Sequence, residues 1–438
     1  MVGRRRWTQA TLVALGLAAA FPDSVLATNG FNFYGFGAET IGVGGADVAL
    51  VRDTSALVTN PAGLAHIKRR QLDSNLDPYY LVDVSHADSL GNDERSKPRL
   101  GGSGSMAYAQ RIGDSNLVAG VGSYVAGGLG FEYRDLDTGF GTRDELVTRF
   151  SVLRVAPGIA WDAGPTLALG ASLSINYAMA RLKEFPDSSV FNLLDPQQSL
   201  FGSRIDGLTG FGFGLNLGLR YVLDPSERWV LGLAYRSRSK LDLDDGKLTV
   251  NYDALGAGRI AYHDVSLHGI TIPQDLQLGL LFRATAHWKL MGELTWIDWS
   301  DAIRDFRIEA SDPERNPLPL LIPDRIERRQ PLEWRDQLVV ALGVMYEPGA
   351  DWRLSAGINF GSQPVPRRNL TPLIAAIPEK HFAIGAGRRI SEAWDLQFAL
   401  VYVAKTSVNY ENSASRVTAD ARETHETFAL SLGISRSW

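Results

Sequence analysis

Large apolar residues recur at every second position over much of the chain, with small or polar residues between them. The clearest example runs from 167 to 179, where the odd positions are apolar and the even positions hold Ala, Gly, Ser and Asn. Because successive side chains of a strand point to opposite faces, this segment has one apolar face and one small or polar face. A soluble sandwich would carry charges opposite its apolar face. The pattern is therefore typical of an outer-membrane barrel, with lipid outside and a filled or polar lumen inside.

The same test along the whole sequence predicts 14 strands, an even number, as expected when both termini of a bacterial barrel lie in the periplasm. The predicted strands are 71–84, 102–112, 115–127, 145–163, 165–183, 206–224, 227–243, 273–284, 286–300, 335–347, 350–362, 379–389, 393–409 and 424–438. Short polar turns alternate with long segments, which are expected to be external loops. The long segments are 85–101, 128–144, 184–205, 244–272, 301–334, 363–378 and 410–423. The sequence thus predicts an all-β membrane protein, a 14-stranded antiparallel transmembrane β-barrel over residues 69–438.

The first 27 residues predict a cleavable signal peptide. Arg4, Arg5 and Arg6 precede an apolar run over 12–21, and small residues follow at 25–27. The run is shorter than the about 20 residues that a membrane-spanning helix needs. The chain contains no cysteine, which excludes disulfides, thiol catalysis and Cys-ligated zinc. Export of such a strand-rich chain indicates either a secreted β-protein or, as the strand pattern favours, a barrel in the outer membrane of a Gram-negative cell.

Residues 28–68 form a Gly-rich segment with neither strand alternation nor a helical stripe. In front of a closed barrel, such a segment is expected to be a plug inside the lumen. Asn60 and Pro61 predict a turn, since Pro fixes φ and Asn favours turns. The many glycines permit tight folding of the segment.

Three sets of residues are candidates for contact with an apolar ligand. Segment 184–205 is unusually apolar for an external loop, which indicates either ligand capture or packing of the loop over the barrel mouth. Gly127, Gly128 and Gly130 interrupt the third predicted strand and indicate either a kink with a lateral gap or the start of a loop. The capture candidates are Phe185, Val190, Phe191, Leu193, Leu194, Leu200 and Phe201. The inward charges Arg220, Arg236 and Lys289 either bind a ligand carboxylate or belong to a salt-bridge network around the plug.

Motifs for catalysis are absent from the sequence. It contains no Gly-x-Ser-x-Gly and no His-Glu-x-x-His motif, and its seven histidines are dispersed. We expect no cofactor and no metal. The net charge of −5 without a basic cluster gives no indication of nucleic-acid binding. A lipid hydrolase assembled from Ser, His and Asn on separate strands stays an open alternative.

The N-terminal segment and the last third of the chain resemble the FadL/TodX (OMPP1) family of outer-membrane transporters for hydrophobic compounds. The N-terminal resemblance rests on Thr40–Ala46, Val48-Ala49, Asp53–Ala56 and Asn60–Leu64. The later one rests on Trp334–Asp336, Trp352–Gly357, Pro364–Pro366 and Thr371-Pro372. One departure is at 378–381, where the acidic-x-x-Arg motif of the family is replaced by Pro-Glu-Lys-His.

The resemblance implies a barrel closed by an N-terminal hatch, with Asn60, Pro61, Ala62 and Gly63 in contact with a kinked third strand. It also implies lateral release of the ligand into the membrane. We therefore predict an uptake channel for hydrophobic compounds, such as long-chain fatty acids or aromatic hydrocarbons. A porin for polar solutes is the alternative, although its first strand would follow the signal peptide closely. The expected partners are an apolar ligand and outer-membrane lipid or lipopolysaccharide. The barrel-assembly machinery is also expected, since the alternating apolar residues that end at Trp438 resemble the assembly signal of outer-membrane barrels.

Overall fold

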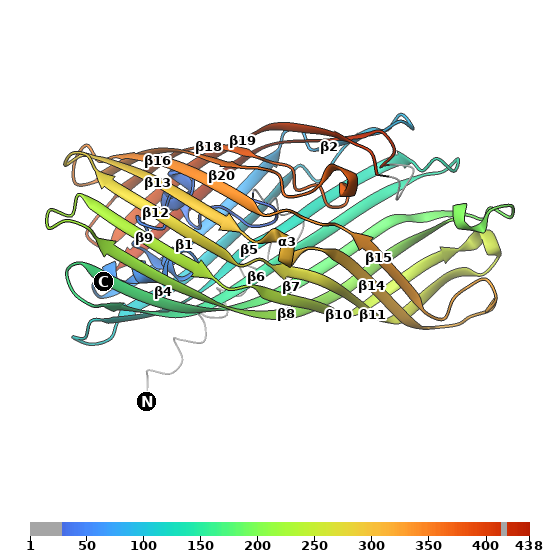
Figure 1. Cartoon of the computed structure of the whole chain (residues 1–438), viewed down its shortest axis with the longest axis horizontal. Helices are drawn as coiled ribbons and strands as arrows, with labels where there is room; N and C mark the ends of the chain where they lie inside the picture. The colour runs from blue at the N-terminus through green and yellow to red at the C-terminus, as the bar shows by residue number, and fades with distance from the viewer. Residues whose placement is uncertain (1–28, 413–417) are drawn as a thin grey trace.

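A closed antiparallel β-barrel of 14 strands makes up most of the molecule, as the sequence predicts (Figure 1). The computed structural model describes residues 29–412 and 418–438, so the predicted signal peptide lies outside the described residues. The barrel closes where β1 pairs with β20, from Gln71 opposite Ser437 to Leu81 opposite Thr427. Within the described residues, no helix is long and apolar enough to span a membrane.

The sheet consists of 20 strand segments, because several barrel strands are divided in two. For example, β9 and β10 both pair with β8 and together form one barrel strand. The segments are β1 (Arg70–Leu81), β2 (Ser85–Ala87), β3 (Asp93–Arg95), β4 (Leu100–Arg111), β5 (Leu117–Asp137), β6 (Arg143–Asp162), β7 (Leu167–Val190), β8 (Leu200–Val222), β9 (Trp229–Arg236), β10 (Ser239–Tyr252), β11 (Gly258–Ile272), β12 (Asp275–Arg283), β13 (Trp288–Ile297), β14 (Asp305–Pro313), β15 (Ile326–Pro331), β16 (Gln337–Tyr346), β17 (Trp352–Gly361), β18 (Lys380–Arg389), β19 (Trp394–Tyr410) and β20 (Ala421–Ser437). Short helices are α2 (Ala38–Gly42), α3 (Trp299–Ala302) and the 3₁₀ turns Thr54–Leu57, Pro61–His66, Pro196–Gln198, Asp253–Leu255 and Arg367–Asn369.

The apolar face of each strand points outwards. On β7 and β8, Leu173 and Phe213 are 54% and 70% exposed, whereas Ser174 and Asn176 are buried inside. Half-exposed tryptophans stand where strands begin after a short turn, namely Trp229, Trp288, Trp352 and Trp394. Aromatic rings prefer the interface between lipid and water, so these residues mark one edge of the membrane-spanning band. We call this edge of the barrel the short-turn end.

We call the opposite end of the barrel the long-hairpin end. Here the sequence predicts long loops, and for four of the segments this prediction is wrong. Segments 128–144, 184–205 and 244–272 are mostly strand, and segment 301–334 contains β14 and β15, because the hairpins continue the sheet beyond the band (Figure 1). The β10–β11 pairing shifts its register three times between Leu241 and Leu248. Each shift changes which positions face inwards, so the period-two pattern is lost although the ladder continues.

The described N-terminal segment, residues 29–69, lies inside the barrel towards the short-turn end (Figure 1). It is held mainly by hydrogen bonds between its backbone and inward side chains of the wall. The Glu293 carboxylate accepts the Asp47 N–H at 2.9 Å and the Val48 N–H at 3.0 Å. On β7, the Ser172 hydroxyl donates to the Leu57 carbonyl at 2.6 Å.

Inward glycines make room for this segment. Gly170 on β7 and Gly218 on β8 are directly paired. A Cβ added to Gly218 would lie 2.1 Å from the Asn60 Oδ1, and one added to Gly170 would lie 2.2 Å from the Pro61 carbonyl carbon. The wall can therefore approach the segment this closely only where side chains are absent.

We expect Gly218→Val to loosen the N-terminal segment, because overpacking of this kind costs about 1–3 kcal/mol. The variant should melt at a lower temperature than the parent and should leak a small polar sugar into cells. Gly214→Val is the matched control, since a Cβ there meets no atom closer than 3.4 Å and lies on the same strand. Equal leakage from both variants would contradict the explanation.

Candidate functional site

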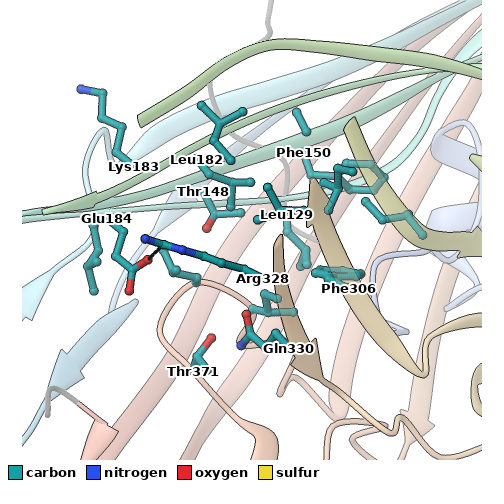
Figure 2. A pocket seen from close by; sticks show the side chains of 18 of the residues that line it. Leu129, Thr148, Phe150, Leu182, Lys183, Glu184, Phe306, Arg328, Gln330 and Thr371 are labelled. Carbon is teal, nitrogen blue, oxygen red and sulfur yellow. Dashed lines mark hydrogen bonds and ion pairs between the residues drawn. The ribbon is translucent and has the colours of Figure 1, made fainter. Parts of the chain in front are cut away.

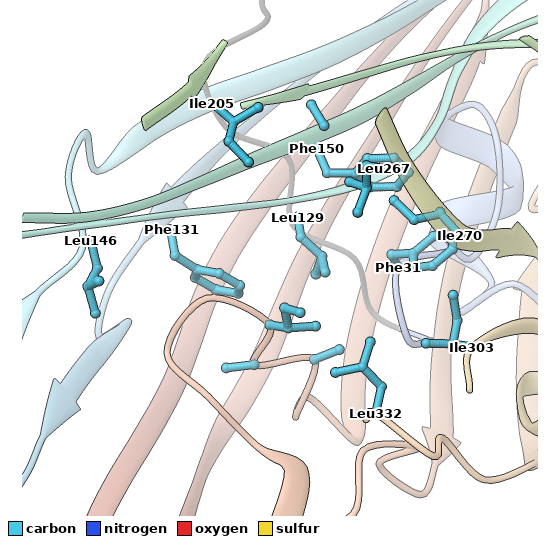
Figure 3. Close-up of a cluster of buried hydrophobic side chains, with 14 of the residues drawn as sticks. Phe31, Leu129, Phe131, Leu146, Phe150, Ile205, Leu267, Ile270, Ile303 and Leu332 are labelled. Carbon is cyan, nitrogen blue, oxygen red and sulfur yellow. The ribbon is translucent and has the colours of Figure 1, made fainter. Parts of the chain in front are cut away.

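A cavity of about 460 Å³ lies above the N-terminal segment, towards the long-hairpin end (Figure 2). Its walls come from distant parts of the chain, including β5, β6, β7, β8, β11 and β14. Most of the apolar side chains that line it belong to the largest cluster of buried apolar residues (Figure 3). The apolar lining includes Phe31, Leu129, Leu146, Phe150, Ile205, Leu248, Leu267, Ile270, Ile303 and Trp334.

Phe31 forms the floor of the cavity. Its ring contacts Phe150 with centroids 5.5 Å apart, Trp299 at 4.8 Å and Trp334 at 6.0 Å. The preceding Gly30 has a φ of 72°, and a Cβ at that position would lie 2.3 Å from the Trp299 ring. Glycine is therefore required for Phe31 to reach this place.

Charged side chains lie at one side of the cavity, and each of the four cations there has a carboxylate partner. Lys183 pairs with Glu145 at 2.5 Å and Arg329 with Asp305 at 2.5 Å. Arg328 has the longest contact, 3.4 Å to Glu184 (Figure 2). A ligand with an anionic head would therefore compete most easily for Arg328.

The capture candidates do not line this cavity. Phe185 is buried, whereas Leu193 and Leu194 are 79% and 97% exposed at the tip of the β7–β8 hairpin. Phe201 packs on Tyr252 with centroids 5.0 Å apart, and the pairing of β7 with β8 ends at Val190 and Leu200. Phe191 contacts Phe201. The arrangement corresponds to the alternative in which the segment buries much of its own apolar surface.

The predicted cations also lie outside the cavity. Arg236 pairs with Asp275 at 3.2 Å, and Lys289 pairs with Glu347 at 2.7 Å. Glu347 also lies 3.8 Å from Arg52 of the N-terminal segment. Arg220, on β8, lies near the short-turn end. Lys289 is therefore linked through Glu347 to Arg52 of the N-terminal segment.

Asn60 and Pro61 contact a different part of the wall from the one that the family resemblance implies. The Asn60 Nδ2 donates to the Leu219 carbonyl of β8 at 3.0 Å and to the Val48 carbonyl at 2.8 Å. The Asn60 Oδ1 accepts the Ala62 N–H and so begins the 3₁₀ turn that contains Gly63. The motif thus joins the N-terminal segment to β7 and β8, where the paired glycines leave space.

The third barrel strand, β5, leaves its neighbour β4 part-way along. The two strands pair from Arg111 opposite Val118 only as far as Ser105 opposite Tyr124. Beyond that point, the Leu100–Gly104 part of β4 pairs only with β1. On its other edge, β5 keeps its partner β6, with a register shift between Val125 and Gly127. The strand therefore does not end at residue 127, as predicted, but separates from β4.

The N-terminal segment occupies the edge of β5 that β4 leaves. The Gly128 N–H donates to the Phe31 carbonyl at 3.0 Å, and Gly127 forms an isolated bridge with Asn32. A Cβ on Gly127 would lie 2.2 Å from that carbonyl oxygen, so glycine is needed for the contact. Gly130 pairs with Arg149 on β6.

A second, smaller cavity of about 90 Å³ lies beside this separation. Tyr79, Ser103 and Val125 line it from β1, β4 and β5, and Phe33 and Phe36 line it from the N-terminal segment. Residues 31–36 therefore run from the floor of the large cavity to the wall of the small one. Leu129 and the floor residue Phe31 are not among the residues that the sequence predicts to contact a ligand. The alternation of Leu129, Phe131 and Tyr133 with small or polar residues is a signal that the strand continues.

A buried histidine fastens the β2–β3 hairpin at the long-hairpin end, outside the membrane-spanning band. The His86 Nδ1 lies 2.5 Å from Glu423 on β20, and its Nε2 lies 3.2 Å from Asp88. Tyr133 and Tyr410 also donate to the Glu423 carboxylate. Burial lowers the pKa of His86, but the hydrogen bonds and charges of Asp88 and Glu423 outweigh it and raise the pKa to about 9.

We expect this contact to give a pH-dependent stability. Because the pKa of His86 is about 9 in the folded protein against 6.5 for the ordinary side chain, its stabilisation is complete below 6.5 and is lost as the pH rises through 9. Limited proteolysis of the hairpin should accelerate over that range in the parent. His86→Gln should be cut faster at low pH and should respond much less to pH. Parallel curves for the two proteins would contradict the assignment.

Residues 24–437 match the sequence profile of the family described as outer membrane protein transport protein (OMPP1/FadL/TodX). The chain belongs to this family of outer-membrane transport proteins. It is 24% identical over 389 residues to the long-chain fatty acid transport protein of Escherichia coli O6:H1, covering 81% of this chain and 82% of the relative. It is 22% identical to the protein of the same name from Salmonella typhi, over 86% of this chain and 87% of that one.

Solved structures of similar fold are also found among outer-membrane transporters. The toluene transporter TodX of Pseudomonas putida has a TM-score of 0.75 at 20% identity, over 92% of this chain and 99% of its own. A FadL homologue of Pseudomonas aeruginosa has a TM-score of 0.71 at 16% identity, over 94% of this chain and 99% of its own. These likenesses show the fold, and the relatives are transport proteins and channels rather than enzymes.

Proposed function

We propose that this member of the family carries small hydrophobic compounds, long-chain fatty acids or aromatic hydrocarbons, across the outer membrane. The observation that supports the proposal is the large apolar cavity with its floor at Phe31. The transfer of an apolar molecule from water to such a cavity is favourable, because its apolar surface is then removed from water. A porin for polar solutes would instead need a continuous polar lumen, and here the N-terminal segment fills the short-turn half.

Release is proposed to be lateral, through the separation of β4 from β5. Residues 31–36 form the partition between the large cavity and the small one, and Gly127 and Gly128 hold this partition through Phe31 and Asn32. If these few contacts break, the two cavities join beside the strand edge. In this scheme the N-terminal segment is a plug. Its fixed part is anchored by the hydrogen bond from Asn60 to β8 and by the hydrogen bonds that it donates to Glu293 of β13.

The orientation and the partners belong to the same proposal. The short-turn end is assigned to the periplasm, with both termini there, and the long hairpins to the cell exterior. Lipopolysaccharide would then surround the long-hairpin edge of the band. The alternating C-terminal strand that ends in Trp438 is the segment that the barrel-assembly machinery would receive. Leu193 and Leu194, exposed at a hairpin tip, stay candidates for first capture.

Uptake by cells that produce the protein tests this function. We expect uptake of labelled oleate or toluene above that of cells without the protein, and no increase for a small polar sugar. A protein lacking residues 28–67 should lose this selectivity and admit the sugar. Sugar uptake through the intact protein, without uptake of either apolar compound, would contradict the proposal and indicate a porin.

A further inference from the structure

A groove of about 450 Å³ crosses the outer, lipid-facing surface of β17, β18, β19 and β20 near the short-turn end. It exists because Ala386 on β18 lies between two larger outward residues, Leu354 on β17 and Phe398 on β19. A methyl group between these side chains leaves a depression in the sheet surface. The groove is lined by Trp352, Ala386, Gly387, Arg388, Leu396, Gln397, Phe398, Leu432, Gly433 and Ile434.

Two exposed arginines stand at the short-turn side of this groove. The Arg388 guanidinium lies 4.9 Å from the centre of the Trp352 ring, and Arg388 on β18 stands directly opposite Trp352 on β17. The Arg436 guanidinium lies 5.2 Å from the Trp394 ring and 5.3 Å from the Trp438 ring. Stacking on these rings holds both cations at the edge of the membrane-spanning band.

Neither guanidinium has a carboxylate within 4.0 Å in the described part of the chain. Exposed arginines at the long-hairpin end differ, since Arg325 pairs with Glu309 and Arg329 pairs with Asp305. A cation held at a membrane interface without a protein anion is placed to meet the phosphate of a lipid head group. An apolar groove that begins beside it is suited to an acyl chain.

We propose that this groove binds one glycerophospholipid of the leaflet at the short-turn end. Its phosphodiester lies between Arg388 and Arg436, and one acyl chain lies over Ala386 along Phe398 and Leu432. Arg388, Leu396 and Ile434 are in register across β18, β19 and β20. Arg436 follows Ile434 by two positions and faces the same side. The two arginines therefore stand on strands about 10 Å apart, which their long side chains can bridge.

The site lies on the outer surface of the barrel and not in the lumen, so it does not depend on which compound the barrel transports. Lipopolysaccharide is a poor candidate for the occupant, because the orientation proposed above places it in the leaflet at the long-hairpin end. A second copy of this chain on the same face is another occupant that the experiment distinguishes.

Native mass spectrometry of the purified full-length protein with dioleoyl phosphatidylglycerol tests the proposal. We expect one saturable lipid per monomer. In the double variant Arg388→Gln and Arg436→Gln, its affinity should fall about tenfold or more. Ala386→Leu fills the groove without a change of charge and should weaken binding to a similar degree. Dioleoylglycerol, which has the acyl chains and no phosphate, should not occupy the site.

Arg228→Gln is the matched control. In the parent, the Arg228 guanidinium lies 5.4 Å from the centre of the Phe282 ring, at the same end of the barrel but outside the groove. It has no carboxylate within 4.0 Å among the described residues. Parent-like affinity in this variant supports a specific site. Equal loss in Arg228→Gln would overturn the proposal in favour of general attraction to the interface. Parent-like affinity in Ala386→Leu, or a dimer that persists and excludes lipid, would overturn it as well. Heat-modifiable migration in gels verifies that each variant is folded.

Discussion

Ile270→Asp is expected to abolish high-affinity binding of oleate or toluene. Ile270 is 4% exposed, lines the large cavity and lies beside Phe31 in the apolar cluster (Figure 3). A carboxylate among these walls costs several kcal/mol without a partner, so binding should weaken at least about 100-fold, at about 1.4 kcal/mol per factor of ten. Isothermal titration with the purified protein and uptake by cells measure the two consequences.

Leu194→Asp is the control for this charge. Leu194 is 97% exposed at the tip of the β7–β8 hairpin, so a carboxylate there stays in water. We expect parent-like binding, and a reduced rate of uptake only if the tip takes part in capture. Ile270→Val verifies that position 270 tolerates a change of shape. Unchanged binding in Ile270→Asp, with the variant folded, would show that the ligand does not use this cavity.

Ser103→Trp is expected to separate binding from uptake. Ser103 faces the small cavity of about 90 Å³ beside the β4–β5 separation, and an indole would fill most of that space. Binding in the large cavity should stay as in the parent. If the ligand must leave through the separation, even about 1.4 kcal/mol added to the barrier slows uptake about tenfold, and we expect at least this much.

The matched control is Met106→Trp, on the opposite, outward face of the same strand, where the ring meets lipid. It should leave both binding and uptake unchanged. Normal uptake through Ser103→Trp would contradict lateral release and favour a route through the N-terminal segment. Loss of binding in Ser103→Trp would instead place the primary site in the small cavity.

The sequence determined the class of the fold and most membrane-spanning strands. Alternation is a local property, because each side chain of a strand faces opposite to its neighbour. It is strong on β7 and β8, where lipid requires apolar residues outside and the packed lumen requires Gly, Ser and Asn inside. The motif at Asn60 also marked an anchored turn. The family assignment followed from such short runs of residues, and the profile match confirms it.

The tertiary structure alone decided where the cavities lie. Phe31, Phe150, Ile270 and Trp334 come together only when the barrel closes, since they are far apart in the chain. Register shifts along β10 and β11 also break the alternation, so the pattern predicts loops at the long-hairpin end where the structure has strands. The partner of Asn60 and the separation of β4 from β5 depend on pairing between distant strands. Local pattern records which residues face inwards, but only closure of the sheet decides which of them meet.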